Sequence, residues 1–126
     1  MKIKLKELEQ MRQSIKTISQ KEMPIKTSYK ISKAMKKLSE ENDLFETKRL
    51  ELADKYAQEK DEKGKAKVEE NGTIKIDMSR SEEFKKEMDE LLDIEFVLDF
   101  EPIEIAELGE INIKPADLIG LEMLIK

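Results

Sequence analysis

The fold is decided by residues 27–60, which read TSYKISKAMKKLSEENDLFETKRLELADKYAQEK. Apolar side chains recur in this stretch at the spacing of one helix face, at Ile31, Met35, Leu38, Phe45, Leu52 and Tyr56. Apolar residues at that spacing form a stripe along one side of an amphipathic helix. About 34 residues at about 1.5 Å each give a rod of roughly 50 Å. The stretch therefore predicts one long helix, which needs packing partners along its length.

A first partner is predicted on the N-terminal side of this helix. The alternation in residues 2–6, KIKLK, favours a short strand that leads directly into a helix over about 5–21. The helical spacing is carried by Leu5, Leu8, Met11, Ile15 and Ile18. Pro24 disfavours helix at the residue before it, so the first helix ends there. Thr27 or Ser28 is then expected to cap the long helix.

A second partner is predicted on the C-terminal side. Ser79 and Glu82 have the Ser-x-x-Glu form of a capping box, and the helix that follows should end near Asp93. Its apolar side is formed by Phe84, Met88, Leu91 and Leu92. The two shorter helices would span roughly 25 and 20 Å. Laid end to end they match the long helix, so we expect both to run antiparallel to it, one over each half.

The Asn-Gly pair at 71–72 predicts a β-hairpin between the long helix and the one after it. A two-residue turn would mix apolar and charged side chains on both faces. A three-residue loop, with the glycine left-handed in a bulge, instead pairs Val68 with Ile74 and Ala66 with Ile76. Because a buried apolar face sets the register of a strand pair, we expect the bulged form.

The last third of the chain is predicted to form short strands and a final helix. Alternation over 94–100 is the strongest strand signal, and 103–105 and 111–113 suggest two more short strands. Pro115 suits the first turn of a helix over about 115–125. That helix is apolar nearly all round, at Leu118, Ile119, Leu121, Met123, Leu124 and Ile125.

These elements predict a helix-dominated α+β fold. It has a long central amphipathic helix with antiparallel shorter helices, a β-hairpin over 66–77, and a small C-terminal sheet plus a final helix. At 126 residues we expect one domain. Within it, residues 1–93 would form the helical hairpin region, and 94–126 the strands and last helix.

Composition limits the classes of protein that the sequence can encode. Charged residues make up 42% and there is no Cys, so no disulfide is expected. No apolar run exceeds three residues, so we expect neither a transmembrane span nor a signal peptide, and no membrane partner. Residues 1–60 carry a net charge of +5 and residues 61–126 one of −10. This polarity is either neutralised within the fold or presented to partners.

The residue types needed for common catalytic sites are sparse. Without His or Cys, no Ser-His-Asp or Cys-His nucleophile and no Cys/His zinc site can form. Tyr29 and Lys33 have the spacing used by short-chain dehydrogenases, but no dinucleotide-binding loop accompanies them. Glu83, Glu87 and Glu90 line one face of a helix, with Asp89 and Asp93 on another, and nothing makes them converge. We therefore expect no cofactor, no metal site and no enzymatic activity.

One surface stands out as a candidate for partner binding. Lys26, Lys30, Lys33 and Lys37 form a basic stripe along the long helix, with Tyr29 beside it. Three interpretations stay open: the stripe is solvated or paired internally, it binds an acidic protein, or it grips nucleic acid through phosphates and stacked bases. An isoelectric point near 5 argues against a dedicated nucleic-acid binder.

Several stretches resemble a family of small, functionally uncharacterised proteins of phages and prophages of Gram-positive bacteria. The matching segments are Pro24–Ile31, Glu46–Tyr56 with Arg49, Leu52 and Lys55, Asn71-Gly72, Glu90–Glu95, Lys114–Leu118 and Leu121-Glu122. The resemblance implies a phage-encoded protein made in the bacterial host cytoplasm, and it carries no activity or site residues. Separately, the order of long helix, hairpin and helix is similar to the arrangement in prefoldin, which is an analogy of fold alone.

From these features we predict a non-enzymatic protein that acts by protein–protein contact, as an assembly factor, structural accessory or host-factor binder. The alternative is a nucleic-acid-associated regulator that uses the basic stripe. We also expect a homodimer. One small sheet can cover only one side of an apolar final helix, and the long helix leaves seams that a symmetry mate would fill.

Overall fold

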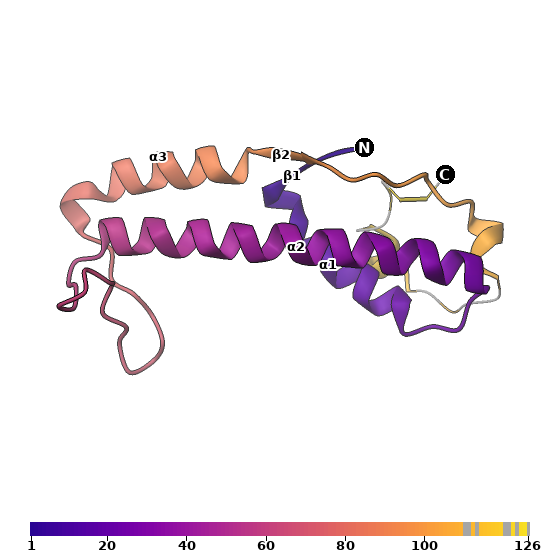
Figure 1. Cartoon of the computed structure of the whole chain (residues 1–126), viewed down its shortest axis with the longest axis horizontal. Coiled ribbons are helices and arrows are strands. Elements are labelled where there is room, and N and C mark those ends of the chain that lie inside the picture. Colours follow the sequence, from indigo (N-terminus) through magenta and orange to yellow (C-terminus); the bar gives the residue numbers. More distant parts are fainter. Residues whose placement is uncertain (110–111, 113, 120–121, 123, 126) are drawn as a thin grey trace. The chain divides into compact units, whose positions relative to one another are not determined.

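The computed structural model describes residues 1–109, 112, 114–119, 122 and 124–125 of the chain. It confirms the helix-dominated α+β class (Figure 1). The elements in chain order are β1 (Lys2–Lys4), α1 (Leu5–Ser19), α2 (Ile25–Tyr56), the 3-10 turn η1 (Met78–Arg80), α3 (Ser81–Leu92), β2 (Glu95–Val97), the 3-10 turn η2 (Ile105–Leu108) and α4 (Pro115–Ile119).

The chain groups into two compact units. The first combines Met1–Asn42 with Glu95–Lys126, and the second is Asp43–Ile94. Helix α2 contributes its first half to one unit and its second half to the other. The pairing of β1 with β2 joins the N-terminal strand to the C-terminal segment within the first unit.

Helix α2 is continuous over 32 residues, as its apolar stripe predicts. It begins at Ile25 and ends at Tyr56, so it starts two residues earlier and ends four residues sooner than expected. The first turn closes through the Ser28 amide, which donates to the carbonyl of Pro24 at 2.9 Å. Ser28 and Thr27 thus lie inside the helix, and the expectation that either one caps it is wrong.

The apolar stripe of α2 is buried to different degrees along its length. Ile31, Leu38 and Tyr56 are buried, whereas Phe45 and Leu52 are half-buried. The stripe is therefore core at both ends of the helix and only partly covered between them.

The first unit has a single apolar core. Helix α1 runs antiparallel to the first half of α2 (Figure 1) and buries all five of the residues expected on its apolar face. A cavity of about 10 Å³ is enclosed by side chains from both helices and from the C-terminal segment, among them Ile15, Ile18, Ile31, Ala34, Ile103, Leu108 and Leu124. These residues, distant in sequence, therefore share one interior.

The sheet of this unit is smaller than predicted, and its strands come from opposite ends of the chain. β1 and β2 are antiparallel, with Ile3 opposite Phe96, and both of these side chains are buried. The amide of Leu98 extends the pairing by donating to the carbonyl of Met1 at 2.8 Å. The alternation over 94–100 thus gives a three-residue strand, because its partner β1 is itself only three residues long.

The remaining C-terminal predictions are corrected in part. Ile105 belongs to η2 rather than to a strand, and Ile103 makes an isolated parallel bridge with Ile125. Helix α4 ends at Ile119, and the bridge at Ile125 excludes the expected helix as far as 125. The third strand at Ile111 and Ile113, and the burial of Leu121, Met123 and the side chain of Leu118, lie outside the described residues.

The second unit pairs α3 with the second half of α2, antiparallel as expected (Figure 1). The rings of Tyr56 and Phe84 meet edge to face with centroids 5.9 Å apart. The predicted capping box is wrong. Asp77 caps the turn before α3 instead, accepting from the Ser79 amide at 3.0 Å, and α3 starts at Ser81.

The hairpin has the predicted bulged tip. Val68 pairs with Ile74, the Gly72 amide donates to the carbonyl of Glu69 at 2.9 Å, and Gly72 has φ +84°. Its base differs from the prediction. Ala66 pairs with Lys60 and Ile76 with Ala57, because residues 57–60, just after α2, insert between the two hairpin arms.

Candidate partner-binding surface

The first turns of α2 set the direction of the predicted lysines. Thr27, Ile31, Ala34 and Leu38 are buried, and the Thr27 hydroxyl donates to the carbonyl of Glu107 at 2.6 Å. Since a helix repeats every 3.6 residues, positions 25, 29, 33 and 36 then point away from the core. The packing of the first unit therefore holds one face of α2 toward solvent.

Two of the four lysines of the predicted stripe form ion pairs with carboxylates. The Lys30 ammonium lies 3.4 Å from Glu107 Oε1, and the Lys37 ammonium lies 3.0 Å from Glu41 Oε1. Both pairs are partly exposed, so each contributes little to stability. They do, however, neutralise these lysines locally, which corresponds to the internally paired interpretation for half of the stripe.

Lys26, Tyr29 and Lys33 remain on the open face. The Tyr29 side chain is 66% exposed, and the Lys33 ammonium lies 5.8 Å from the centre of its ring. Lys26 and Lys33 are both exposed and form no ion pair with any residue that the structure describes. A cation over an exposed ring gains about 0.5–1 kcal/mol, which is enough to favour one arrangement of the pair.

Sequence reasoning missed two members of this surface. Ile25 is the first residue of α2, lies one turn before Tyr29 and is 82% exposed. Lys36 is exposed on the same side. Pro24 could have indicated that Ile25 belongs to the helix, because a proline is tolerated at the very start of a helix and the helix can begin directly after it. We call Ile25, Lys26, Tyr29, Lys33 and Lys36 together the Tyr29 strip.

The predicted acidic residues of α3 do not form a ligand cage. Glu87 accepts from the Lys55 ammonium at 2.9 Å, and this bond, together with one from the Tyr56 hydroxyl, lowers the pKa of Glu87. The same contact with Glu87 raises the pKa of Lys55 and of Tyr56. Arg80 stacks 4.4 Å from the centre of the Tyr56 ring. Among the described residues, no three carboxylates are placed to hold a metal ion.

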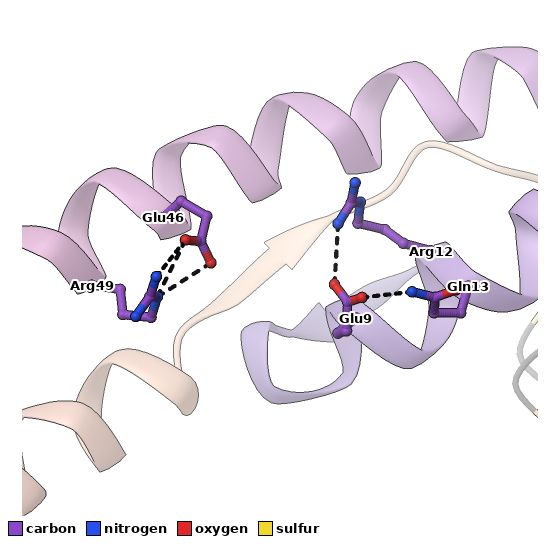
Figure 2. A network of polar contacts seen from close by, with 5 residues as sticks. All are labelled: Glu9, Arg12, Gln13, Glu46 and Arg49. Atoms are coloured by element: carbon purple, nitrogen blue, oxygen red, sulfur yellow. Dashed lines mark hydrogen bonds and ion pairs between the residues drawn. The ribbon is translucent and has the colours of Figure 1, made fainter. Parts of the chain in front are cut away.

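Other charged groups pair along their own helices. Figure 2 shows Arg49 bonded to Glu46, with a shortest contact of 2.8 Å, a contact that raises the pKa of Arg49. It also shows Glu9 accepting from Arg12 at 3.1 Å and from Gln13 at 2.9 Å. These pairs are three or four residues apart, the spacing at which helix side chains meet, so they stabilise helices rather than form a site.

Comparison of this chain with protein-family models, curated proteins and solved structures finds no match. Within the described part of the chain, no helix is both long and apolar enough to cross a bilayer. The Tyr29 strip therefore has to be interpreted from its own chemistry.

Proposed function

We propose that this is a non-enzymatic, phage-encoded protein that acts in the bacterial host cytoplasm by binding another protein through the Tyr29 strip. It would serve as an assembly factor, a structural accessory or a binder of a host factor. One observation carries the proposal: an isoleucine and a tyrosine, 82% and 66% exposed, lie one turn apart on α2, beside lysines that have no carboxylate partner among the residues that the structure describes.

The chemistry of the strip defines the partner. Tyrosine is enriched among the residues that dominate protein interfaces, because it brings a large contact area at a small entropic cost. Lys26 and Lys33 flank it and favour an acidic surface, which they would attract over a distance of about 10 Å at ordinary ionic strength. The expected partner thus presents an apolar side chain ringed by carboxylates.

A second candidate function is binding of single-stranded nucleic acid. The exposed Tyr29 ring, with Lys33 beside it, is the kind of platform on which a base stacks. Against this interpretation, Lys30 and Lys37 are already neutralised, and the whole chain carries a charge of −5. We therefore favour the protein partner.

The test compares three baits in lysate of phage-infected host cells. The strip variant carries Lys26→Glu, Tyr29→Ala and Lys33→Glu, and the control carries Lys85→Glu and Lys86→Glu on an exposed part of α3. We expect one protein to be retained by the wild type and the control and to be lost from the strip variant. Equal retention by all three baits would contradict the proposal.

A parallel titration with single-stranded DNA and RNA separates the two functions. Binding that weakens steeply with salt, and that is lost in the strip variant, would replace the protein partner by nucleic acid. We also propose that the chain forms a homodimer. The Tyr29 strip leaves the dimer surface undefined, and the second unit provides a candidate for it.

A further inference from the structure

The second unit, residues 43–94, buries few apolar side chains of its own. Its buried apolar side chains are Ala53, Tyr56, Ala57 and Leu91. In the same unit, Leu44, Leu50, Val68, Met78 and Ile94 are between 46% and 82% exposed. Two helices side by side bury only the seam between them, and stable helical units add a second layer. This helix pair therefore has an unfilled side.

That side is a groove between α2 and α3. It has a volume of about 520 Å³, and its walls include Leu52 from α2, Leu91 from α3 and Ile94 just after α3. Leu52 is half-buried and Ile94 is 51% exposed. Leu44, 57% exposed, lies two turns before Leu52 on the same side of α2 and extends the apolar strip. The groove offers apolar contact along a helix of about 18 Å.

The two rims of the groove differ in charge. The α2 rim carries Lys48 and Lys55 with Glu51, whereas the charged residues of the α3 rim are Glu87 and Glu90. Within the chain, Lys48 pairs with Glu51 at 3.2 Å and Lys55 with Glu87 at 2.9 Å, both in partly exposed contacts. Glu90 is exposed and forms no ion pair with the described residues. The α2 rim thus has a formal charge of +1 and the α3 rim one of −2, and a second copy of the groove can present the opposite sign to each rim.

We propose that two copies of this chain pack groove to groove into an antiparallel four-helix bundle, with a two-fold axis along the groove. That axis places α2 of one copy over α3 of the other, so Lys55 lies level with Glu87 of its mate and within a turn of Glu90. A two-fold axis across the groove would instead stack α2 on α2 and oppose like charges. The charge pattern selects the first arrangement.

The first test measures mass by sedimentation equilibrium. A homodimer with a micromolar dissociation constant is almost fully formed at about 100 µM protein. We expect the wild type to be dimeric, and Leu52→Glu to be monomeric with its helical circular dichroism retained. The matched control is Leu50→Glu, on the opposite side of α2, which should stay dimeric. A monomeric wild type, or a Leu52→Glu variant that remains dimeric, overturns the proposal.

The second test uses exposed charges, so that it does not depend on how Leu52→Glu folds. Lys55→Glu and Glu87→Lys each place like charges within the chain and across the interface, so each variant alone should dimerise at least tenfold more weakly. Mixing the two restores opposite charges only across the interface. We expect the mixture to form a heterodimer. Failure of the mixture to associate shows that the Lys55–Glu87 pair acts within one chain and refutes the interface.

This dimer develops the self-association part of the proposed function and does not use the Tyr29 strip. The strip variant should therefore remain dimeric, and Leu52→Glu should still bind a single partner molecule. If no variant affects partner binding while the dimer behaves as expected, the proposed function fails alone. If the wild type is monomeric while the strip variant still loses its partner, the dimer fails alone.

Discussion

Leu38→Ala is the most direct test of the register of α2. The Leu38 side chain is 1% exposed, in the half of α2 that packs with α1 and the C-terminal segment. The change removes carbon atoms equivalent to about three buried methylene groups, worth about 2.4 kcal/mol in transfer free energy, and the cavity left behind adds to this. We expect the free energy of unfolding to fall by about 3–4 kcal/mol.

Two neighbouring changes calibrate that loss. Lys37→Ala removes a partly exposed side chain and one ion pair with Glu41, so it should cost about 0.5 kcal/mol or less. Phe45 belongs to the same apolar stripe as Leu38, so Phe45→Ala tests the same face of the helix. Because Phe45 is only half-buried, Phe45→Ala should lower the free energy of unfolding by less than Leu38→Ala does.

The assay is urea denaturation followed by far-ultraviolet circular dichroism, with the midpoint and the slope fitted separately. A shift of the midpoint at constant slope reports stability alone. Equal losses for Leu38→Ala and Lys37→Ala, or a larger loss for Phe45→Ala than for Leu38→Ala, would refute the assignment of the buried face.

Two further predictions concern the second unit. Gly72→Ala should destabilise the hairpin tip by about 1 kcal/mol, because Gly72 has φ +84°, a conformation that alanine adopts only with strain. The added methyl group meets no other atom, so backbone strain is the whole effect. Slower amide exchange at Glu69 in the variant than in the wild type would contradict this. The pKa of Glu87 is lowered in the folded state by its bonds from Lys55 and Tyr56, so its contribution to stability is complete above the ordinary value of 4.5 and is lost as pH falls through the lowered folded value. Glu87→Gln should therefore flatten the acid limb of the stability profile in thermal melts, and an unchanged limb would show that the bond contributes nothing.

The features predicted correctly from the sequence are those encoded locally. The period of apolar residues fixed α1, α2 and α3, because burial of one helix face leaves a trace every three or four positions. The left-handed glycine at 72 and the pairing of Val68 with Ile74 follow from a few neighbouring residues. Helix ends were less accurate. Asp77 and Pro24 stand where a helical segment actually begins. The prediction instead chose the Ser-x-x-Glu pattern at Ser79 and the Thr-Ser pair at 27–28 as caps.

The features that were missed depend on pairing between distant segments. The partner of β2 is β1, more than ninety positions away, so the alternation over 94–100 gave the strand but not its length or its neighbour. Likewise the arms of the hairpin are separated at their base by residues 57–60, which no local pattern assigns to a sheet. Strand pairing depends on which segments meet in space, and side-chain alternation alone does not specify that.

The candidate surface shows the same limit in its electrostatics. The sequence places four lysines on one stripe, but Glu107, which neutralises Lys30, is 77 residues away and reaches it only because Thr27 and η2 share the core of the first unit. Among the described residues, most other ion pairs join two side chains of the same half of the sequence, so they do little to cancel the +5 of residues 1–60 against the −10 of residues 61–126. Lys30 and Lys37 are neutralised within the fold by ion pairs with Glu107 and Glu41. Presentation to a partner is what we propose for Lys26 and Lys33, and the two substitutions Lys26→Glu and Lys33→Glu test that remainder directly.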